Sequence, residues 1–266
     1  MLEFGRALDV GIKRRGKKNQ DALRIVKRFS KRPFLIVADG MGGFRGGREA
    51  SRIVIRTLCW AYRTTRRKID LDQLLTQSIG KAHQRIIKKS KTNEALAKMG
   101  STVACVVLDE KNNKLTLANV GDTRAYLINH EKIELISYDH SEVAELERKG
   151  VLDAVEAQNY ARKNVLTMSL AASRPPNTVQ PYIAEVPFPP ESLVLLCSDG
   201  LWGSVPDNII RLTALEYQPK QAAEKLIEFA NASGGPDNIS ILIARRRGEW
   251  KDYQEKYSDE LDDTTP

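Results

Sequence analysis

The sequence contains few cysteines and few histidines, which limits the crosslinks and metal sites it can form. Its three cysteines, Cys59, Cys105 and Cys197, lie far apart, form no CxxC pair and each fall within an apolar run. This argues against structural disulfides and favours small, buried core side chains. Because there are also only three histidines, a zinc site of thiolates and imidazoles is disfavoured.

Long apolar runs are missing as well. No segment approaches the roughly 20 apolar residues that cross a bilayer. The first residues lack the basic region and the apolar stretch of a secretory signal. We therefore expect a cytoplasmic protein without a membrane partner. A hydrophobic content of 41% in 266 residues is typical of a chain that folds around a sizeable core.

Acidic residues are scarce in the first part of the chain. Residues 1–99 hold 25 Lys and Arg against 8 Asp and Glu, whereas residues 100–266 hold 17 against 26, for a formal charge of +8 overall. Such asymmetry occurs in proteins that bind nucleic acids or membranes. The basic residues are scattered over predicted helices and loops, so we favour a solvated surface that attracts anionic substrates and expect no nucleic-acid partner.

Short β-rich runs are interspersed with segments of helical period. The sequence predicts strands over residues 34–38, 102–108, 114–120, 124–128, 192–197 and 238–244. Apolar stripes predict helices over 48–65, 71–91 and 220–232, and Pro206 predicts a short helix that ends at 212. This order indicates an α+β fold of antiparallel sheets with helices outside, and not a parallel doubly wound sheet. We expect one domain over 1–247 and a polar, acidic tail over 248–266.

Carboxylates stand next to predicted strands at Asp39, Asp122, Asp199 and Asp237, and Asp21 precedes the apolar run 22–26. A strand anchored in a core can fix a carboxylate with the tolerance of a catalytic metal site. A glycine beside it, such as Gly40, lets the backbone approach closely enough for its carbonyl to serve as a ligand. All-oxygen ligands are typical of Mg²⁺ and Mn²⁺. Asp-Gly is also a common turn, so spacing alone leaves open whether these carboxylates meet.

Eight short segments occur in order between residues 19 and 238: NQDA (19–22), VADGMGG (37–43) followed by GREAS (47–51), GST (100–102), ANVGDTR (118–124), DHS (139–141), RKNVLT (162–167), CSDGLW (197–202) and GPDN (235–238). In this series the sequence resembles the metal-dependent protein Ser/Thr phosphatases of the protein phosphatase 2C type, in their compact bacterial form. The resemblance implies a four-layer αββα sandwich of two antiparallel β-sheets flanked by helices.

The resemblance also implies a reaction and a set of ligands. Phosphoserine and phosphothreonine would be hydrolysed by a water activated by two Mg²⁺ or Mn²⁺ ions, with a third ion at a further site. Asp39 would bridge the two ions, Gly40 would offer its carbonyl to one, and Asp199 and Asp237 would complete the other. Asp122, with Asp199, would hold the third. Asp21 would act near the first pair through water, and Asn238 would orient its neighbours.

The sequence departs from the family pattern at several positions around the site. Gln20 replaces an acid and contributes no charge, and Met41 and Phe44 stand where relatives carry histidines. Where the family places a phosphate-binding arginine, this chain has Gly16. We predict that Arg15 or Arg14 takes that role, because a guanidinium suits phosphate; the alternative is that both are surface charges. His140 is interpreted as structural.

The resemblance finally implies the partners. We expect a monomer that acts on phosphorylated proteins, the substrates of a bacterial Ser/Thr kinase, with residues 141–164 as a flap beside the site. Two alternatives stay open: a pseudo-phosphatase that uses the fold as a sensor, and a nucleic-acid-binding protein. Retention of Asp39, Asp199 and Asp237 argues against the first.

Overall fold

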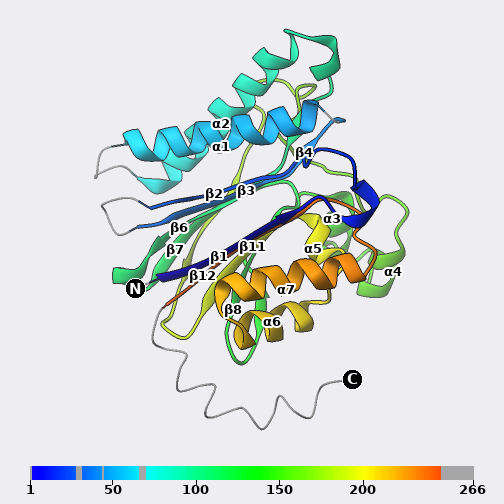
Figure 1. The fold of residues 1–266 in the computed structure, drawn as a ribbon. Helices are drawn as coiled ribbons and strands as arrows, with labels where there is room; N and C mark the ends of the chain where they lie inside the picture. Colours follow the sequence, from blue (N-terminus) through cyan, green and yellow to red (C-terminus); the bar gives the residue numbers. More distant parts are fainter. Residues whose placement is uncertain (1, 28–31, 44, 66–69, 247–266) are drawn as a thin grey trace.

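Two antiparallel sheets lie face to face in the centre of the molecule, and helices cover both outer faces (Figure 1). The computed structural model describes residues 2–27, 32–43, 45–65 and 70–246. Phe44 and the predicted tail lie outside this part. The layered arrangement confirms the predicted α+β sandwich. No described helix is long and apolar enough to cross a membrane.

Each large sheet has five strands joined in antiparallel pairs. The first sheet runs in the order β1 (Leu2–Asp9), β12 (Ile239–Arg246), β11 (Leu193–Cys197), β8 (Arg124–Ile128) and β9 (Ile133–Leu135). The second runs in the order β10 (Tyr182–Pro187), β7 (Lys114–Val120), β6 (Val103–Asp109), β3 (Phe34–Ala38) and β2 (Ala22–Val26). A short pair, β4 (Gly40–Met41) and β5 (Gly100–Ser101), adjoins the second sheet.

The helices follow the predicted stripes closely. Helices α1 (Gly46–Thr64) and α2 (Leu71–Ser90) cover the second sheet, and α6 (Asp207–Glu216) and α7 (Pro219–Ala232) cover the first (Figure 1). Pro206 is the N-cap of α6, and the helix runs to residue 216, four residues beyond the predicted end. Short helices α3 (Glu142–Arg148), α4 (Ala154–Asn159) and α5 (Asp199–Trp202) lie in the connections.

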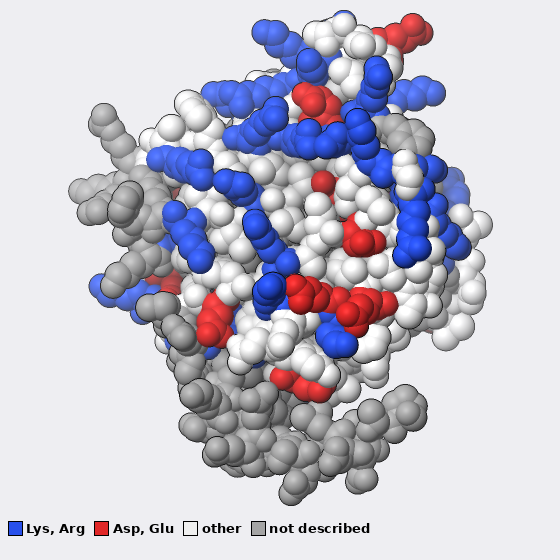
Figure 2. Space-filling view, in the orientation of Figure 1, with Lys and Arg blue, Asp and Glu red and all other residues white. Residues whose placement is uncertain are grey.

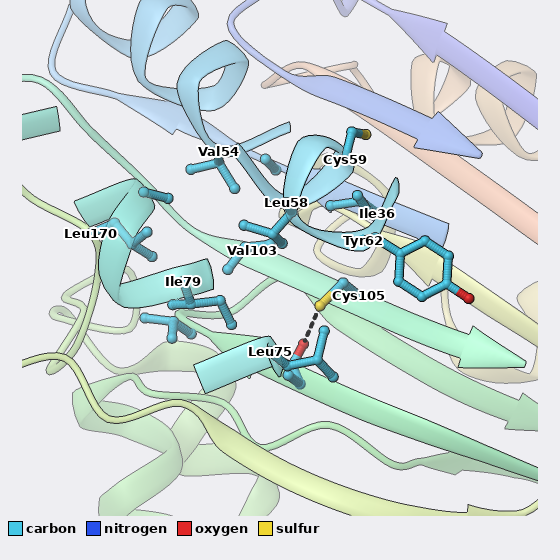
Figure 3. Packing of buried hydrophobic residues seen from close by; sticks show 14 of the residues in the cluster. Ile36, Val54, Leu58, Cys59, Tyr62, Leu75, Ile79, Val103, Cys105 and Leu170 are labelled. Carbon is cyan, nitrogen blue, oxygen red and sulfur yellow. Dashed lines mark hydrogen bonds between the residues drawn. The ribbon is translucent and has the colours of Figure 1, made fainter. Parts of the chain in front are cut away.

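The charge asymmetry of the sequence is visible on the surface. Figure 2 shows Lys and Arg side chains gathered over the part of the molecule where α1 and α2 lie, with few acidic side chains among them. Beneath these helices the residues are apolar. Figure 3 shows Val54 and Leu58 of α1 with Leu75 and Ile79 of α2, packed in the same buried cluster as the sheet residue Val103.

The cysteines belong to this core, as predicted. Cys105 is fully buried in β6 and its Sγ donates to the carbonyl of Ala118 at 3.4 Å (Figure 3). Burial raises the pKa of the Cys105 thiol to about 12. Cys197 is equally buried, among residues that face α6 and α7. Both thiols therefore stay protonated and unreactive at neutral pH.

Candidate metal centre

Strand pairing brings the predicted aspartates to one end of the sandwich. In the second sheet Ala22 pairs with Ala38, so Asp21, just before β2, lies beside Asp39, just after β3. In the first sheet Cys197 pairs with Ile241, so Asp199, just after β11, lies near Asp237, two residues before β12. Antiparallel neighbours place the start of one strand next to the end of the other, which explains both pairs. Asp122 lies in the turn between β7 and β8, the point where the chain passes between the two sheets.

The backbone of Asp39 is held by the neighbouring GST segment. Thr102 N and Ser101 Oγ donate to Asp39 O at 2.9 and 2.8 Å, and Asp39 N donates to Thr102 Oγ1 at 3.4 Å. A side chain on Gly40 would not fit, because an added Cβ would lie 2.1 Å from the carbonyl oxygen of Gly47 at the start of α1. The glycines of this turn therefore allow α1 to begin directly against the metal-site loop.

Asp21 is fixed from the other sheet. Ser240 Oγ donates to Asp21 Oδ2 at 2.6 Å, and Asp21 N donates to Asn19 Oδ1 at 2.8 Å. Asn238 accepts from Gln20 N at 2.8 Å and donates to Val10 O at 2.9 Å, so it ties the loop before β2 to the start of β12. These contacts give Asn238 the geometry of an orienting residue.

The aspartate cluster is electrostatically unfavourable by itself. Burial raises the pKa of Asp21 and of Asp122 to about 6, and their side chains are 6% and 9% exposed. Burial, followed by repulsion from the other aspartates of the cluster, raises the pKa of Asp39 and Asp199 well above the usual range. Oδ1 of Asp21 and Oδ1 of Asp199 are buried without a hydrogen-bond partner. Buried carboxylates that repel each other and lack donors need a cation.

A divalent ion fits this donor set. Among the described residues, no three His, Cys, Asp or Glu side chains form a site by themselves. Mg²⁺, however, usually takes only one or two carboxylates and keeps several waters, so such ions need no cage of three protein side chains. The unpartnered oxygens of Asp21 and Asp199 supply hard donors of the kind these ions prefer.

Arg14, and not Arg15, faces the aspartates. Arg14 Nη2 donates to Asp237 Oδ2 at 2.5 Å, with the two side chains 31% and 32% exposed. The Gln20 amide, oriented so that its nitrogen donates to Gly40 O at 3.2 Å, accepts from Arg14 Nη1 at 3.2 Å. Arg15 ends a single 3₁₀ turn and is exposed. The loop thus brings one guanidinium to the rim of the site.

A second network was not assigned from the sequence. Arg124 Nε and Nη2 donate to Asp139 Oδ2 at 2.9 and 2.8 Å, and the guanidinium lies 3.7 Å from the ring centroid of Trp202. Trp202 Nε1 in turn donates to Asp122 O at 3.0 Å. These residues hold the Asp122 turn against α5. All of these residues belong to the eight short segments identified in the sequence. The segments therefore gave their positions but not their contacts.

His140 contacts the same turn. Its backbone N–H donates to Gly121 O at 3.0 Å, and its ring Nδ1 lies 3.3 Å from Gly121 N. The side chain is 7% exposed, and burial lowers its pKa. A neutral imidazole that packs on a turn supports the predicted structural role.

The chain resembles known phosphatases along most of its length. Residues 11–234 match the family model described as protein phosphatase 2C. The chain is 32% identical over 232 residues to the serine/threonine phosphatase Stp of Listeria innocua, an alignment that covers 86% of this chain and 90% of the relative.

Solved structures extend the likeness to the fold. Stp1 from Staphylococcus aureus superposes with a TM-score of 0.84 at 29% identity, covering 93% of this chain and 96% of that one. The catalytic domain of PstP in complex with two manganese ions gives 0.78 at 28% identity, covering 92% and 97%. The family match, the identity to Stp and the shared fold establish that the chain belongs to the protein phosphatase 2C family.

Proposed function

We propose that the aspartate cluster carries the activity of this phosphatase by holding two ions, Mg²⁺ or Mn²⁺. As a member of the family, the chain is a metal-dependent protein serine/threonine phosphatase. The observation that supports the assignment is the group of buried and half-buried, mutually repelling carboxylates with unpartnered oxygens. In this proposal Asp39 would serve both ions, the carbonyl of Gly40 would hold one, and Asp199 and Asp237 would hold the other.

The remaining acids have supporting roles in the proposal. Asp122 and Asp199 would hold a third ion, and Asp21 would act on the first pair through water. When bound, such ions activate a water for attack on phosphorus and offset the charge of the phosphoryl oxygens. The protein's own contribution is to fix the carboxylates: the hydrogen bonds from Ser101, Thr102 and Ser240 hold Asp39 and Asp21 before substrate arrives.

Substrate phosphate would be gripped by Arg14. Its guanidinium already lies beside a carboxylate at the rim of the site, where a phosphoryl group can replace Asp237 as its partner. Asn238 and Gln20 would orient this loop through their contacts with Val10, Gly40 and Arg14. Arg15, which is exposed, is the weaker candidate.

The proposal also covers the substrates, the cellular location and the oligomeric state of the protein. The substrates are phosphoproteins, and we propose that a Ser/Thr kinase generates them. We further propose that the protein acts in the cytoplasm as a monomer, with residues 141–164 as a flap that influences substrate choice.

Calorimetric titration with Mn²⁺ tests the ligand roles separately. The wild type should bind two ions more tightly than any third. Asp39→Asn should lose both tight ions, whereas Asp122→Asn should lose only the weaker one. Glu224→Gln, which removes an exposed acid on α7, is the control and should titrate as the wild type. Two tight ions retained in Asp39→Asn would overturn the bridging role.

A further inference from the structure

A predominantly basic stripe runs along the solvent face of α1. Counted from the N-cap, the stripe consists of Arg45, Arg48, Arg52, Arg56 and Arg63, with Trp60 among them. Their spacings of three, four and seven residues place them on one side of a helix that turns every 3.6 residues. The buried residues of α1, such as Val54 and Leu58, lie on the opposite side. We call this set the arginine stripe.

Within the described part of the chain the arginines of the stripe form no salt bridges, and the stripe's Trp60 has the Lys81 ammonium over its ring. None of its members takes part in any of the salt bridges there, which involve other basic residues. The only acid within α1 is Glu49, which stands four residues after Arg45 and three before Arg52 but forms no salt bridge among the described residues. Helix α7 differs, because its Lys220 and Lys225 each have a glutamate partner three or four residues on.

This arrangement opposes helix stability. Like charges four residues apart, as in Arg48 and Arg52 or Arg52 and Arg56, repel each other along a helix. Positive charge at the N-terminal turn, here Arg45 and Arg48, also opposes the helix dipole. A solvated face normally mixes both signs. A local rule broken without a compensating contact is typical of a functional surface.

The stripe begins at the metal site. Gly47 lies against Gly40, so Arg45 and Arg48 stand at the loop that carries Asp39. From there the helix leads away, and the 18 residue-to-residue steps from Arg45 to Arg63 span about 27 Å at 1.5 Å per step. Figure 2 shows basic side chains spread over this region of the surface. A protein substrate whose phosphorylated residue sits at the site must extend past one of its edges.

We propose that the arginine stripe docks an acidic, extended segment of the phosphoprotein substrate. This inference rests on the proposed function of the metal centre. Arg48, Arg52 and Arg56 follow one another at about 6 Å along the helix, which is close to the roughly 6.8 Å between alternate residues of an extended chain. About eight residues with Asp or Glu at every second position would match the full stripe. Carboxylates pair with guanidinium groups in a planar, bidentate geometry, which favours arginine over lysine here.

Steady-state kinetics with matched peptides tests the proposal. Two phosphothreonine peptides carry an eight-residue Glu-Ala repeat, one before the phosphothreonine and the other after it. A third peptide carries Gln in place of Glu. The double variant R52Q/R56Q lies away from the site, and loss of like-charge repulsion should leave α1 folded. K88Q/K89Q removes the same charge from exposed positions of α2 and is the control.

We expect the wild type to have a lower KM for one acidic peptide than for the Gln peptide. R52Q/R56Q should raise that KM about three- to tenfold, as expected for two exposed ion pairs, with kcat unchanged. R52Q/R56Q should match the wild type in its KM for the Gln peptide and in its rate on p-nitrophenyl phosphate. K88Q/K89Q should match the wild type in KM and kcat for every peptide. The preference for the acidic peptide should shrink in 0.5 M NaCl.

Several outcomes would overturn the proposal. Equal KM values for acidic and Gln peptides in the wild type would do so, as would equal effects of R52Q/R56Q and K88Q/K89Q. Binding of duplex DNA that R52Q/R56Q abolishes, without any acidic-peptide preference, would identify a nucleic-acid surface. A lower KM for the Gln peptide in R52Q/R56Q would show that the chain's own acidic residues 248–266 occupy the stripe.

A binding assay separates this proposal from the proposed function. Fluorescence anisotropy of the labelled acidic peptide needs no turnover. If R52Q/R56Q weakens binding of the acidic peptide and K88Q/K89Q does not, the stripe is supported, whether or not the protein hydrolyses phosphopeptides with Mn²⁺. A lack of hydrolysis with Mn²⁺ would count against the metal centre alone. Turnover of the Gln peptide without any acidic-peptide binding would count against the stripe alone.

Discussion

Replacing Asp21 with Asn should make the metal-free protein more stable. The Asp21 carboxyl is 6% exposed, and burial raises its pKa from 3.8 to about 6. A shift of about two pH units corresponds to about 3 kcal/mol of unfavourable free energy in the folded state at neutral pH. Because burial is the main cause of this shift and Asp21 also repels Asp39, removing its charge should recover about 1–3 kcal/mol.

The effect has a defined pH dependence. A carboxyl with a raised folded pKa is protonated in both states below about pH 4, so it then carries no penalty. As the pH rises from about 4 to about 6, the unfolded chain ionises first and the folded wild type loses stability relative to it. Asp21→Asn lacks this group. Its advantage should therefore be largest above pH 6 and nearly absent at pH 4.

Urea unfolding in EDTA at pH 7.5 and pH 4.5 measures this difference. Mn²⁺ at pH 7.5 should reverse the order, since the wild type gains about 2.7 kcal/mol at a hundred times its Kd and the variant less. The exposed Glu224→Gln control should stay within about 0.5 kcal/mol of the wild type. Asp21→Asn could be less stable than the wild type in EDTA at pH 7.5, or its gain in free energy of unfolding could be the same at both pH values. Either result would show that the buried Asp21 carboxylate does not destabilise the metal-free protein.

Three further predictions follow from particular contacts. Arg14→Ala should raise the KM for a phosphopeptide about tenfold, while Arg15→Ala leaves it near the wild-type value; the reverse pattern would assign phosphate to Arg15. Arg124→Ala leaves Asp139 buried without its partner and should cost about 3 kcal/mol in urea unfolding with Mn²⁺ present, and a loss below 1 kcal/mol would contradict this. Iodoacetamide at pH 7.5 should leave turnover intact, because burial raises the pKa of the Cys105 thiol to about 12; rapid inactivation would reveal a reactive cysteine.

The central strands were readable from the sequence because they are buried on both faces. β3 (Phe34–Ala38) is a continuous apolar run, and each of its residues is buried in the structure. The four edge strands, β1 and β9 of the first sheet and β10 and β2 of the second, were not predicted. They are partly exposed, and β1 contains Gly5, so their patterns do not stand out from loops.

The site was only partly readable, for a related reason. An aspartate just before or after an apolar run can be recognised from neighbouring residues alone, and each of the five aspartates was identified in this way. That Asp21 meets Asp39 depends on the pairing of Ala22 with Ala38, which no local pattern encodes. The choice between Arg14 and Arg15 depends on a 3₁₀ turn that starts after Gly11 at φ 76°. Side-chain partners such as Trp202 and Asp122 O likewise follow from packing and not from spacing.

Hydrolysis of a phosphothreonine peptide by Asp39→Asn tests the central claim most directly. The wild type should turn the peptide over with Mn²⁺ or Mg²⁺ and stop in EDTA. Asp39→Asn should lose at least about a hundredfold in kcat/KM with either ion, because the carboxylate proposed to serve both ions is gone. Glu224→Gln should remain fully active. Full turnover by Asp39→Asn, or wild-type turnover that persists in EDTA, would contradict an aspartate-held metal centre.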